Sequence, residues 1–561
     1  MPVMQQATPS AFATFDHSSS GSAATSTWSV PTRGPEATDT DVLIVGAGAT
    51  GLTLACDLAR RGVRFRILDK AQQAFGGSRG KGIQPRTLEV FDGLGIAKPL
   101  LAAGAPYPPM RLHWWFLRWT WHMIKPHKQT PDVPYPNTWL VPQWRTEEVL
   151  RSRLAELGCG VEYGSEVTDF AQDAAGVVVQ LSQAGVSHAL RARYLVGADG
   201  GRSFVRKRLG VKFIGNTSDE GRMIVGDLRV DGLSREHWHV WPTRKGGMVA
   251  LCPLPHSDLF QLMMKIDPSE VEPELSESSI QSRWLAATGL KNLRLHSPAW
   301  LSVFRPNVRL VERYRTAHVL LAGDAAHVHT PAGAQGLNTG VQDAWNLGWK
   351  LALVLRGAPE ALLDTYEEER MPVAAGVLKL SSELFKATTQ RTAITRLTRG
   401  DEERQLLLNY HASSLADAAG AGQVGKVLAG DRAPDAPCAQ SSAARTTLFD
   451  AFRGGHFTVL AFGTKAIAEV QPLNQADPSV LRVVAVVAHS SVDGQVVDDQ
   501  GHARRAYGVG DDENVTFVVR PDGYVGQVAS GQWRQAITNY LNRVLGPALQ
   551  GGAVSSTAAL A

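Results

Sequence analysis

Between residues 42 and 69, two segments with strand-like hydrophobic patterns flank one segment with helical periodicity. Val42–Val45 is a continuous apolar run, which predicts a buried strand. Apolar positions from Leu52 to Ala59 recur at helical spacing, and the alternation from Val63 to Ile67 predicts a second strand that ends at Asp69. The glycine-rich stretch 46–51 separates the first strand from the helix. This order of strand, glycine turn, helix and strand predicts an α/β fold.

The middle of the chain carries shorter alternating segments. Residues 238–255 predict a hairpin that turns at 245–247, and Phe260, Leu262 and Met264 alternate on a third strand. These segments predict an α+β unit with a mostly antiparallel sheet.

Later segments predict one more buried strand, one long helix and a separate C-terminal domain. The strand is Val319–Ala322, and apolar spacing from Val341 to Leu355 predicts the helix. After about Gly430 the pattern changes to short strands, expected at 456–463, 481–489 and 515–520, with a closing helix at 532–545.

Composition narrows the class of protein. The chain has 561 residues, 44% of them hydrophobic, and a net charge of +4, which gives no reason to expect nucleic acid as a partner. No apolar run approaches the ~18 residues that a membrane span needs. The four cysteines are far apart and have no zinc spacing, so we predict no metal. Residues 1–39 are rich in Ser, Thr and Gly and lack the apolar stretch of a signal peptide, so we expect a cytoplasmic protein.

The glycine turn has the spacing of a dinucleotide-binding loop. Gly46 permits the tight turn, Gly48 lets a pyrophosphate approach the backbone, and Gly51 lets helix and strand pack closely. The N-terminus of the following helix offers N–H groups to phosphates, and Asp69 can accept hydrogen bonds from ribose hydroxyls. The turn alone does not decide between NAD and FAD.

Three further segments carry a family resemblance. They are Gly77-Ser78-Arg79-Gly80-Lys81-Gly82, the stretch 194–203 with Gly197-Ala198-Asp199-Gly200, and Gly323-Asp324-Ala325-Ala326-His327 with its continuation to Gly340. Over residues 41–395 the chain resembles the class A FAD-dependent monooxygenases, the p-hydroxybenzoate hydroxylase superfamily. The resemblance implies FAD as cofactor, with NADPH or NADH and O₂ as co-substrates. It also implies a Rossmann-like FAD-binding domain interleaved with the α+β substrate domain.

The resemblance also assigns roles to single residues. Asp324 would bind the ribityl chain, and Asp199 belongs to a fingerprint linked to both FAD and the nicotinamide. A helix beginning at Gly336 would direct its positive end at the flavin, which favours the anionic reduced form. The complete set of expected FAD-binding residues is Gly46, Gly48, Gly51, Asp69, Arg79, Gln143, Asp199, Asp324, Gly336, Leu337 and Asn338.

The C-terminal part resembles the thioredoxin-like appendage of phenol hydroxylase and its bacterial relatives. The matching stretches are 430–434, 448–450 and 519–523. A working thioredoxin carries CxxC after its first core strand, whereas Phe462-Gly463 is followed here by Thr464 and Lys465. We therefore expect a redox-inert domain that serves packing, assembly or access.

These patterns divide the chain into six parts. We expect disordered termini at 1–39 and 547–561 and a helical linker at 396–426. The expected FAD-binding domain comprises 40–113, 141–215 and 305–395, the substrate domain 114–140 and 216–304, and the thioredoxin-like domain 427–546.

The resemblance implies hydroxylation of a phenolic or polycyclic aromatic substrate through a flavin C4a-hydroperoxide. The backbone carbonyl of Pro331 is the candidate group that polarises a substrate hydroxyl. The prolines that follow Ala250-Leu251-Cys252 stand where p-hydroxybenzoate hydroxylase has a carboxylate-binding arginine and serine. Because proline has no side-chain donor, we expect a substrate without a carboxylate held there. The expected substrate pocket consists of Trp241, Pro253, Pro255, Phe260 and Leu262.

Several alternatives stay open at this stage. The protein is an aromatic hydroxylase as described above, a flavin oxidase or dehydrogenase without oxygen insertion, or a turnover-deficient binding or assembly protein. The aromatic segment 113–122 is a strand packed between domains, a pocket lining or lid, or a membrane-surface contact. Glu147-Glu148 and the run 367–370 are expected on solvated helix faces. A monomer and a homodimer both remain open.

Overall fold

The computed structural model describes residues 38–115, 117–218, 221–243, 247–267, 269–330, 333–389, 400–417, 425–440, 445–489 and 495–546. Its N-terminal part is built on an eight-stranded sheet with the strand order β19-β20-β11-β1-β2-β8, to which β10 and β9 are added beside β11. These strands are β1 (Thr40–Val45), β2 (Phe65–Asp69), β8 (Val161–Tyr163), β9 (Ser165–Asp173), β10 (Gly176–Gln183), β11 (Val186–Gly197), β19 (Arg315–Thr316) and β20 (Val319–Leu321).

The central strands of this sheet are parallel. β1 pairs in parallel with β2 and with β11, and β11 pairs in parallel with β20. Parallel strands end at the same edge of a sheet, so the segments that follow β1, β2 and β20 come close together. Apolar residues of α1 (Ala49–Arg60), α4 (Gln143–Glu156) and α7 (Gly336–Leu355) pack with these strands in one buried core.

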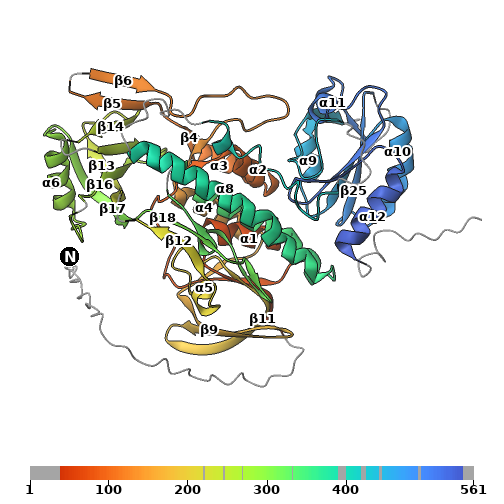
Figure 1. Ribbon diagram of the computed structural model, residues 1–561, viewed down its shortest axis with the longest axis horizontal. Helices are drawn as coiled ribbons and strands as arrows, with labels where there is room; N and C mark the ends of the chain where they lie inside the picture. The colour runs from red at the N-terminus through yellow and green to blue at the C-terminus, as the bar shows by residue number, and fades with distance from the viewer. Residues whose placement is uncertain are drawn as a thin grey trace, which may run out of the picture. The chain divides into compact units, whose positions relative to one another are not determined.

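A second sheet follows the order β17-β13-β16-β15-β14-β5-β6. Its strands are β5 (Met110–Trp114), β6 (Leu117–Trp121), β13 (Met223–Asp231), β14 (Trp238–Pro242), β15 (Met248–Pro253), β16 (Leu259–Lys265) and β17 (Arg294–Phe304). We call it the middle sheet. All its pairings are antiparallel except that of β14 with β5. Helix α6 (Glu277–Thr288) packs on one of its faces (Figure 1).

The C-terminal part has its own sheet, in the order β23-β22-β26-β25-β24-β27-β28. In the residues that the structure describes, helices accompany it, drawn in blue in Figure 1. The strands are β22 (Pro437–Gln440), β23 (Arg445–Thr447), β24 (Phe457–Phe462), β25 (Leu481–Val487), β26 (Gln495–Val497), β27 (Val515–Val519) and β28 (Val525–Ala529). The helices are α9 (Leu448–Phe452), α10 (Thr464–Val470), α11 (His502–Tyr507) and α12 (Trp533–Leu545).

The expected mixed α/β class is confirmed, and most predicted elements lie within two residues of their expected bounds. The expected helical linker at 396–426 is not seen: in 400–417 and 425–426 the only helical piece is a 3₁₀ turn at Glu402–Arg404. The long helix α8 (Asp364–Thr389) ends before that segment. None of the helices in the described ranges combines the length and apolarity of a membrane span.

Candidate active site

The glycine turn between β1 and α1 is shaped by close backbone packing. A Cβ at Gly46 would collide with the carbonyl oxygen of Ala198, and one at Gly51 would collide with the carbonyl oxygen of Gly46. Gly46 also has a φ of 106°, a region that favours glycine. A Cβ at Gly48 would meet nothing closer than Glu147 Oε1, at 3.9 Å. Gly48 therefore borders open space at the start of α1.

Asp69 holds this turn from the end of β2. Its Oδ2 accepts a hydrogen bond from the Ala47 N–H at 2.9 Å, and its Oδ1 accepts one from the Ala71 N–H at 2.9 Å. Asp69 thus fixes the turn as well as standing where a ribose would bind. Next to it, the first N–H groups of α1 have no partners within their own helix and carry the positive end of its dipole, which suits a phosphate.

Helix α4 brings two polar side chains to the same place. Gln143 Oε1 accepts from the Gly80 N–H at 3.0 Å, and its Nε2 donates to Glu147 Oε1 at 2.8 Å. Burial raises the pKa of Glu147 above its ordinary value, while the hydrogen bonds from Gln143 and from the Ala49 N–H lower it. The expectation of a solvated Glu147 is wrong. Its spacing from buried Leu150 on α4 was the available signal.

Helix α7 begins beside the glycine turn. Gly323 and Gly340 both pack against Thr50 of α1, where a Cβ on either glycine would collide with the threonine side chain. Gly336 is the first residue of α7, and the side chain of Leu337 lies 3.5 Å from a Cβ built on Gly80. The fold therefore brings the glycine turn, the loop around Gly80 and the start of α7 together.

The neighbouring acidic turn carries Asp324. It lies on a 3₁₀ turn, Gly323–Ala325, that follows β20, and its side chain is exposed. Pro331, whose carbonyl was the candidate catalytic group, lies outside the described residues.

Asn338 ties the start of α7 to the loop after Gly80. Its Oδ1 accepts from the Gln84 N–H at 2.8 Å, and its Nδ2 donates to the carbonyl oxygens of Gly82 at 2.8 Å and Ala334 at 2.6 Å. Both amide protons are used, so the side chain of Asn338 shapes the backbone around this site.

Asp199 serves the start of α5 (Phe204–Arg208). Its Oδ2 accepts from the N–H groups of Phe204 at 2.6 Å and Val205 at 3.2 Å. The Arg79 guanidinium is exposed and lies over the Phe75 ring, 5.1 Å from its centroid.

A buried ionic cluster links α7 to two neighbouring segments through Asp343. His327 Nε2 lies 2.6 Å from Asp343 Oδ2, and Asp343 Oδ1 accepts from Arg370 Nε at 2.8 Å. All three side chains are fully buried, and the neighbouring Glu369 is buried as well, so the expectation of a solvated face at 367–370 is wrong for Arg370 and for Glu369. Within the described ranges, no group of three or more His, Cys, Asp and Glu side chains is arranged to hold a metal ion.

Most of the expected pocket residues of the middle sheet lie on the face that carries α6. Trp241, Phe260 and Leu262 pack in the core between the sheet and α6, together with Trp284 of that helix. Pro253 pairs directly with Phe260 and therefore shares that face. Successive strand residues alternate between faces, so a slip of one position exchanges the two sets.

The opposite face of the middle sheet is turned toward the loop at 78–82. Trp238, Val240 and Cys252 pack there with Leu140, and Met263 and Ala250 are partly buried beside them. Lys81 links the loop to this face, because its ammonium lies over the Trp238 ring, 4.1 Å from the centroid, and its Nζ donates to Gln261 Oε1 at 2.5 Å. This face is the wall of the candidate substrate site.

A buried carboxylate lies on the same face. Asp227 Oδ2 accepts from Trp300 Nε1 at 2.6 Å, and burial raises the pKa of Asp227, against the opposing effects of Trp300, Ser78 and Lys81. The sequence pattern missed Asp227, Gln261 and Lys81. The alternation along β16 gave the signal for Gln261, once its correct face is known.

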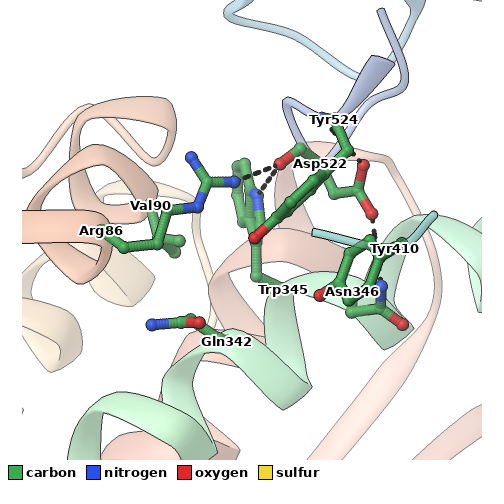
Figure 2. Close-up of a pocket in the computed structure, with 8 residues that line it drawn as sticks. All are labelled: Arg86, Val90, Gln342, Trp345, Asn346, Tyr410, Asp522 and Tyr524. Atoms are coloured by element: carbon green, nitrogen blue, oxygen red, sulfur yellow. Dashed lines mark hydrogen bonds between the residues drawn. The ribbon is translucent and has the colours of Figure 1, made fainter. Parts of the chain in front are cut away.

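A tight joint connects the C-terminal part to α2 (Pro85–Gly93) and α7. Figure 2 shows eight residues around a small pocket at this joint, where the backbone carbonyl of Asp522 accepts from Arg86 Nη2 at 2.8 Å and Trp345 Nε1 at 3.0 Å. The Asp522 carboxylate accepts from Asn346 Nδ2 at 3.3 Å and from Trp349 Nε1 at 3.2 Å. Because these polar groups bond to each other, the joint has a structural role: it holds the C-terminal part against α2 and α7.

Two family models cover most of this chain. A model for an FAD-binding domain matches residues 39–381, and a model for the C-terminal part of aromatic-ring hydroxylases matches residues 426–548. The chain belongs to the FAD-dependent aromatic hydroxylases.

Similar proteins agree with this assignment. A flavin-dependent monooxygenase of Mycobacteroides abscessus is 43% identical over 518 residues, which cover 90% of this hydroxylase and 100% of the relative. A 6-methylpretetramide 4-monooxygenase of Streptomyces rimosus is 35% identical over 534 residues, covering 89% and 92% of the two chains. The crystal structure of aklavinone-11 hydroxylase with FAD and aklavinone matches with a TM-score of 0.76 and 27% identity, covering 91% of this chain and 100% of that one.

The hydroxylase is therefore a flavin-dependent monooxygenase that uses FAD, O₂ and a reduced nicotinamide. The comparisons give no support to an oxidase, a dehydrogenase or a turnover-deficient protein. The geometry fits FAD: Gly48 leaves space at the start of α1, Asp324 is exposed beside it, and α7 begins next to both without a capping side chain at Gln335.

Proposed function

We propose that this hydroxylase adds one oxygen atom to a phenolic polycyclic aromatic substrate. The observation that carries this proposal is the apolar face of the middle sheet, which is turned toward the loop at 78–82. An apolar wall whose polar side chains are Lys81, Gln261 and Asp227 suits fused aromatic rings that carry hydroxyl groups. Two relatives, named for 6-methylpretetramide and for aklavinone, support a substrate of several fused rings.

The chain's own residues bind and orient the cofactor in this proposal. The N-terminus of α1 would receive the pyrophosphate over Gly48, Asp69 would face the ribose, and Asp324 the ribityl chain. The positive end of α7 at Gly336 would stabilise negative charge on the reduced flavin. Bound FAD supplies the redox chemistry, accepting hydride from the nicotinamide and activating O₂.

The middle sheet would hold the substrate and exclude water. At the positions of β15 that face the loop, Ala250 and Cys252 carry no cationic group, and the Lys81 ammonium beside them is engaged by Gln261 and the Trp238 ring, which favours a substrate without a carboxylate at that point. Exclusion of water by this face would prevent the activated oxygen from being released as peroxide before it reaches the substrate.

The C-terminal part is proposed to be a thioredoxin-like domain at 427–546 without redox activity. Support comes from the parallel pairing of β24 with β25 and the antiparallel pairing of β24, β27 and β28, flanked by α10 and α12. Helix α10 begins at Thr464, where a thioredoxin would carry its cysteines. In place of the expected boundary at 113, we propose 40–109, 141–215 and 305–395 as the FAD-binding segments, with 110–140 and 216–304 forming the substrate domain, because β5 (Met110–Trp114) belongs to the middle sheet.

The test is oxidation of NADH and of NADPH by the FAD-loaded protein against a panel of phenols and polycyclic aromatics, with peroxide measured in parallel. The proposal predicts that a polycyclic phenol accelerates nicotinamide oxidation with little peroxide. Uniformly fast oxidation with stoichiometric peroxide for every compound would contradict it.

A further inference from the structure

The hairpin of β5 and β6 extends the middle sheet beyond β14 (Figure 1). β5 pairs in parallel with β14, with Leu112 opposite Val240. β6 pairs only with β5 among the described strands, so it forms the edge of the sheet. The hairpin is therefore a continuation of the same wall that faces the candidate active site.

The two faces of the hairpin differ sharply in chemistry. Cross-strand pairs place Met110 opposite Trp121, Leu112 opposite Trp119, and Trp114 opposite Leu117. Directly opposed residues share a face, so all six apolar side chains lie on one side. The other side carries the polar and cationic side chains of Arg111, His113, Arg118 and Thr120.

The apolar side of the hairpin is the side that continues the substrate wall. Met110 and Leu112 pack in the same cluster as Trp238, Val240 and Cys252. On the opposite side His113 stacks on Trp241, 4.7 Å between ring centroids, and so belongs to the face that carries α6. The tryptophans of the hairpin thus lie on the Val240 face, beyond the residues nearest to Lys81.

This apolar side is uncovered in the described structure. Trp114 is 60% exposed, Leu117 60% and Trp119 49%. Trp119 and Trp121 stack face to face, with ring centroids 4.9 Å apart and planes inclined by 19°, so the pair presents an outer ring face and ring edges. Of the three alternatives that the sequence left open, these exposures do not fit a strand packed between domains. A contiguous exposed apolar patch of this kind marks a binding surface.

We propose that the β5–β6 hairpin is the outer wall of the substrate site, where the stacked Trp119–Trp121 pair contacts rings distant from the ring that is hydroxylated. The proposal rests on the proposed function. The outer wall would give the hydroxylase a preference for substrates with several fused rings. Continuity with the inner wall favours this occupant over a membrane, because Met110 and Leu112 of the hairpin pack in one cluster with Trp238 and Val240 of that wall.

Binding measurements on the FAD-loaded protein test this proposal. The variants are Trp119→Ala and Trp121→Ala, with Arg118→Ala and Thr120→Ala as matched controls on the other face of the same strand. Anhydrotetracycline serves as the four-ring probe and phenol as the one-ring probe, each titrated by calorimetry. FAD content and melting temperature are measured for every variant to establish that the fold is retained.

We expect each tryptophan variant to raise the Kd for anhydrotetracycline about tenfold, since an aromatic stacking partner and its apolar contact are lost. The same variants should leave the Kd for phenol within about twofold, and the two control variants should change neither Kd by more than that.

Equal weakening of both probes, or no weakening of the four-ring probe, would overturn the proposal. Conversion of a dimer into a monomer by the tryptophan variants would assign the surface to a second copy, and loss of binding to phosphatidylcholine vesicles would assign it to a membrane. Wild-type protein that binds phenol but not anhydrotetracycline would overturn this inference and leave hydroxylation intact. Wild-type protein that binds neither would overturn the proposed substrate class as well.

Discussion

Gly48 is the residue of the glycine turn at which we expect open space, rather than packing, to matter for cofactor binding. Its Cβ would meet no protein atom closer than 3.9 Å, so Gly48→Ala should fold normally. The added methyl group would stand where the pyrophosphate approaches the backbone, and we expect the Kd for FAD to rise at least about tenfold. Fluorescence titration of the apoprotein with FAD measures this change.

Gly160→Ala is the matched control, because a Cβ there also meets nothing within 4 Å and the residue lies away from the turn. It should leave FAD affinity unchanged. Unaltered FAD binding by Gly48→Ala would show that the pyrophosphate does not pass over this residue.

Glu147 gives the apoprotein a pH dependence of stability. Burial raises its pKa, so folding favours the protonated carboxyl. That contribution is fully present below the ordinary pKa of 4.5 and is lost as the pH rises through the raised value. Glu147→Gln stays neutral, so its free energy of unfolding should exceed that of the wild type by more at about pH 7.5 than at about pH 4. Urea unfolding at both pH values measures the difference, and a pH-independent difference would contradict it.

Single residues differ in how far the sequence predicts their environment. The glycine spacing at 46–51 predicted the turn, because only glycine fits at Gly46 and Gly51. The burial of Glu147 and Arg370 was missed, because charged residues are rarely buried without partners. Arg370 finds its partner Asp343 on another helix, whereas Glu147 is paired with Gln143 of its own helix.

At the scale of elements, the middle sheet separates stability from substrate binding by face. Leu262 is fully buried against α6, so Leu262→Ala should lower the free energy of unfolding by about 2–5 kcal/mol with little change in KM. Its neighbour Met263 lies on the opposite face, beside Trp238 and Cys252. Met263→Ala should change KM for the aromatic substrate with a smaller loss of stability.

Chemical denaturation and steady-state kinetics of the two variants check this prediction. A larger change in KM for Leu262→Ala than for Met263→Ala would restore the expected pocket. The sequence alternation located β14, β15 and β16 but not which face meets the cofactor loop, since the faces of a strand buried on both sides are both apolar.

At the scale of the whole molecule, a buried ionic network joins the C-terminal domain to α7 and α8. Arg520 Nη1 donates to Glu369 Oε1 at 2.6 Å, and Lys350 Nζ donates to Glu369 Oε2 at 2.7 Å. The carboxylate of Asp522 bonds to Trp349 and Asn346 beside them. All these ionic side chains are buried, so each depends on its partners.

Asp522→Ala should lower the free energy of unfolding by about 3–5 kcal/mol, because buried donors lose their acceptor. Asp512→Ala, an exposed position in the same domain, should stay within about 0.5 kcal/mol of the wild type. Chemical denaturation of both variants measures the effect. Equal stability of the two would mean that the joint contributes nothing to the folded state.

The sequence predicted the existence of the C-terminal domain but not this joint. Glu369 and Arg520 lie far apart in the chain, and no local pattern indicates that they meet. The change to a pattern of short strands near Gly430 was a local signal in the sequence. Docking of the turn at 520–523 onto α7 instead depends on the completed fold.

The most direct test of the central claim is the source of the oxygen in the product. The FAD-loaded protein is supplied with NADPH, a polycyclic phenol and ¹⁸O₂, and the product is analysed by mass spectrometry. Our account predicts a hydroxylated ring carrying one ¹⁸O atom, formed together with little peroxide. Oxidised product without ¹⁸O, or stoichiometric peroxide without hydroxylated product, would contradict monooxygenase action at this site.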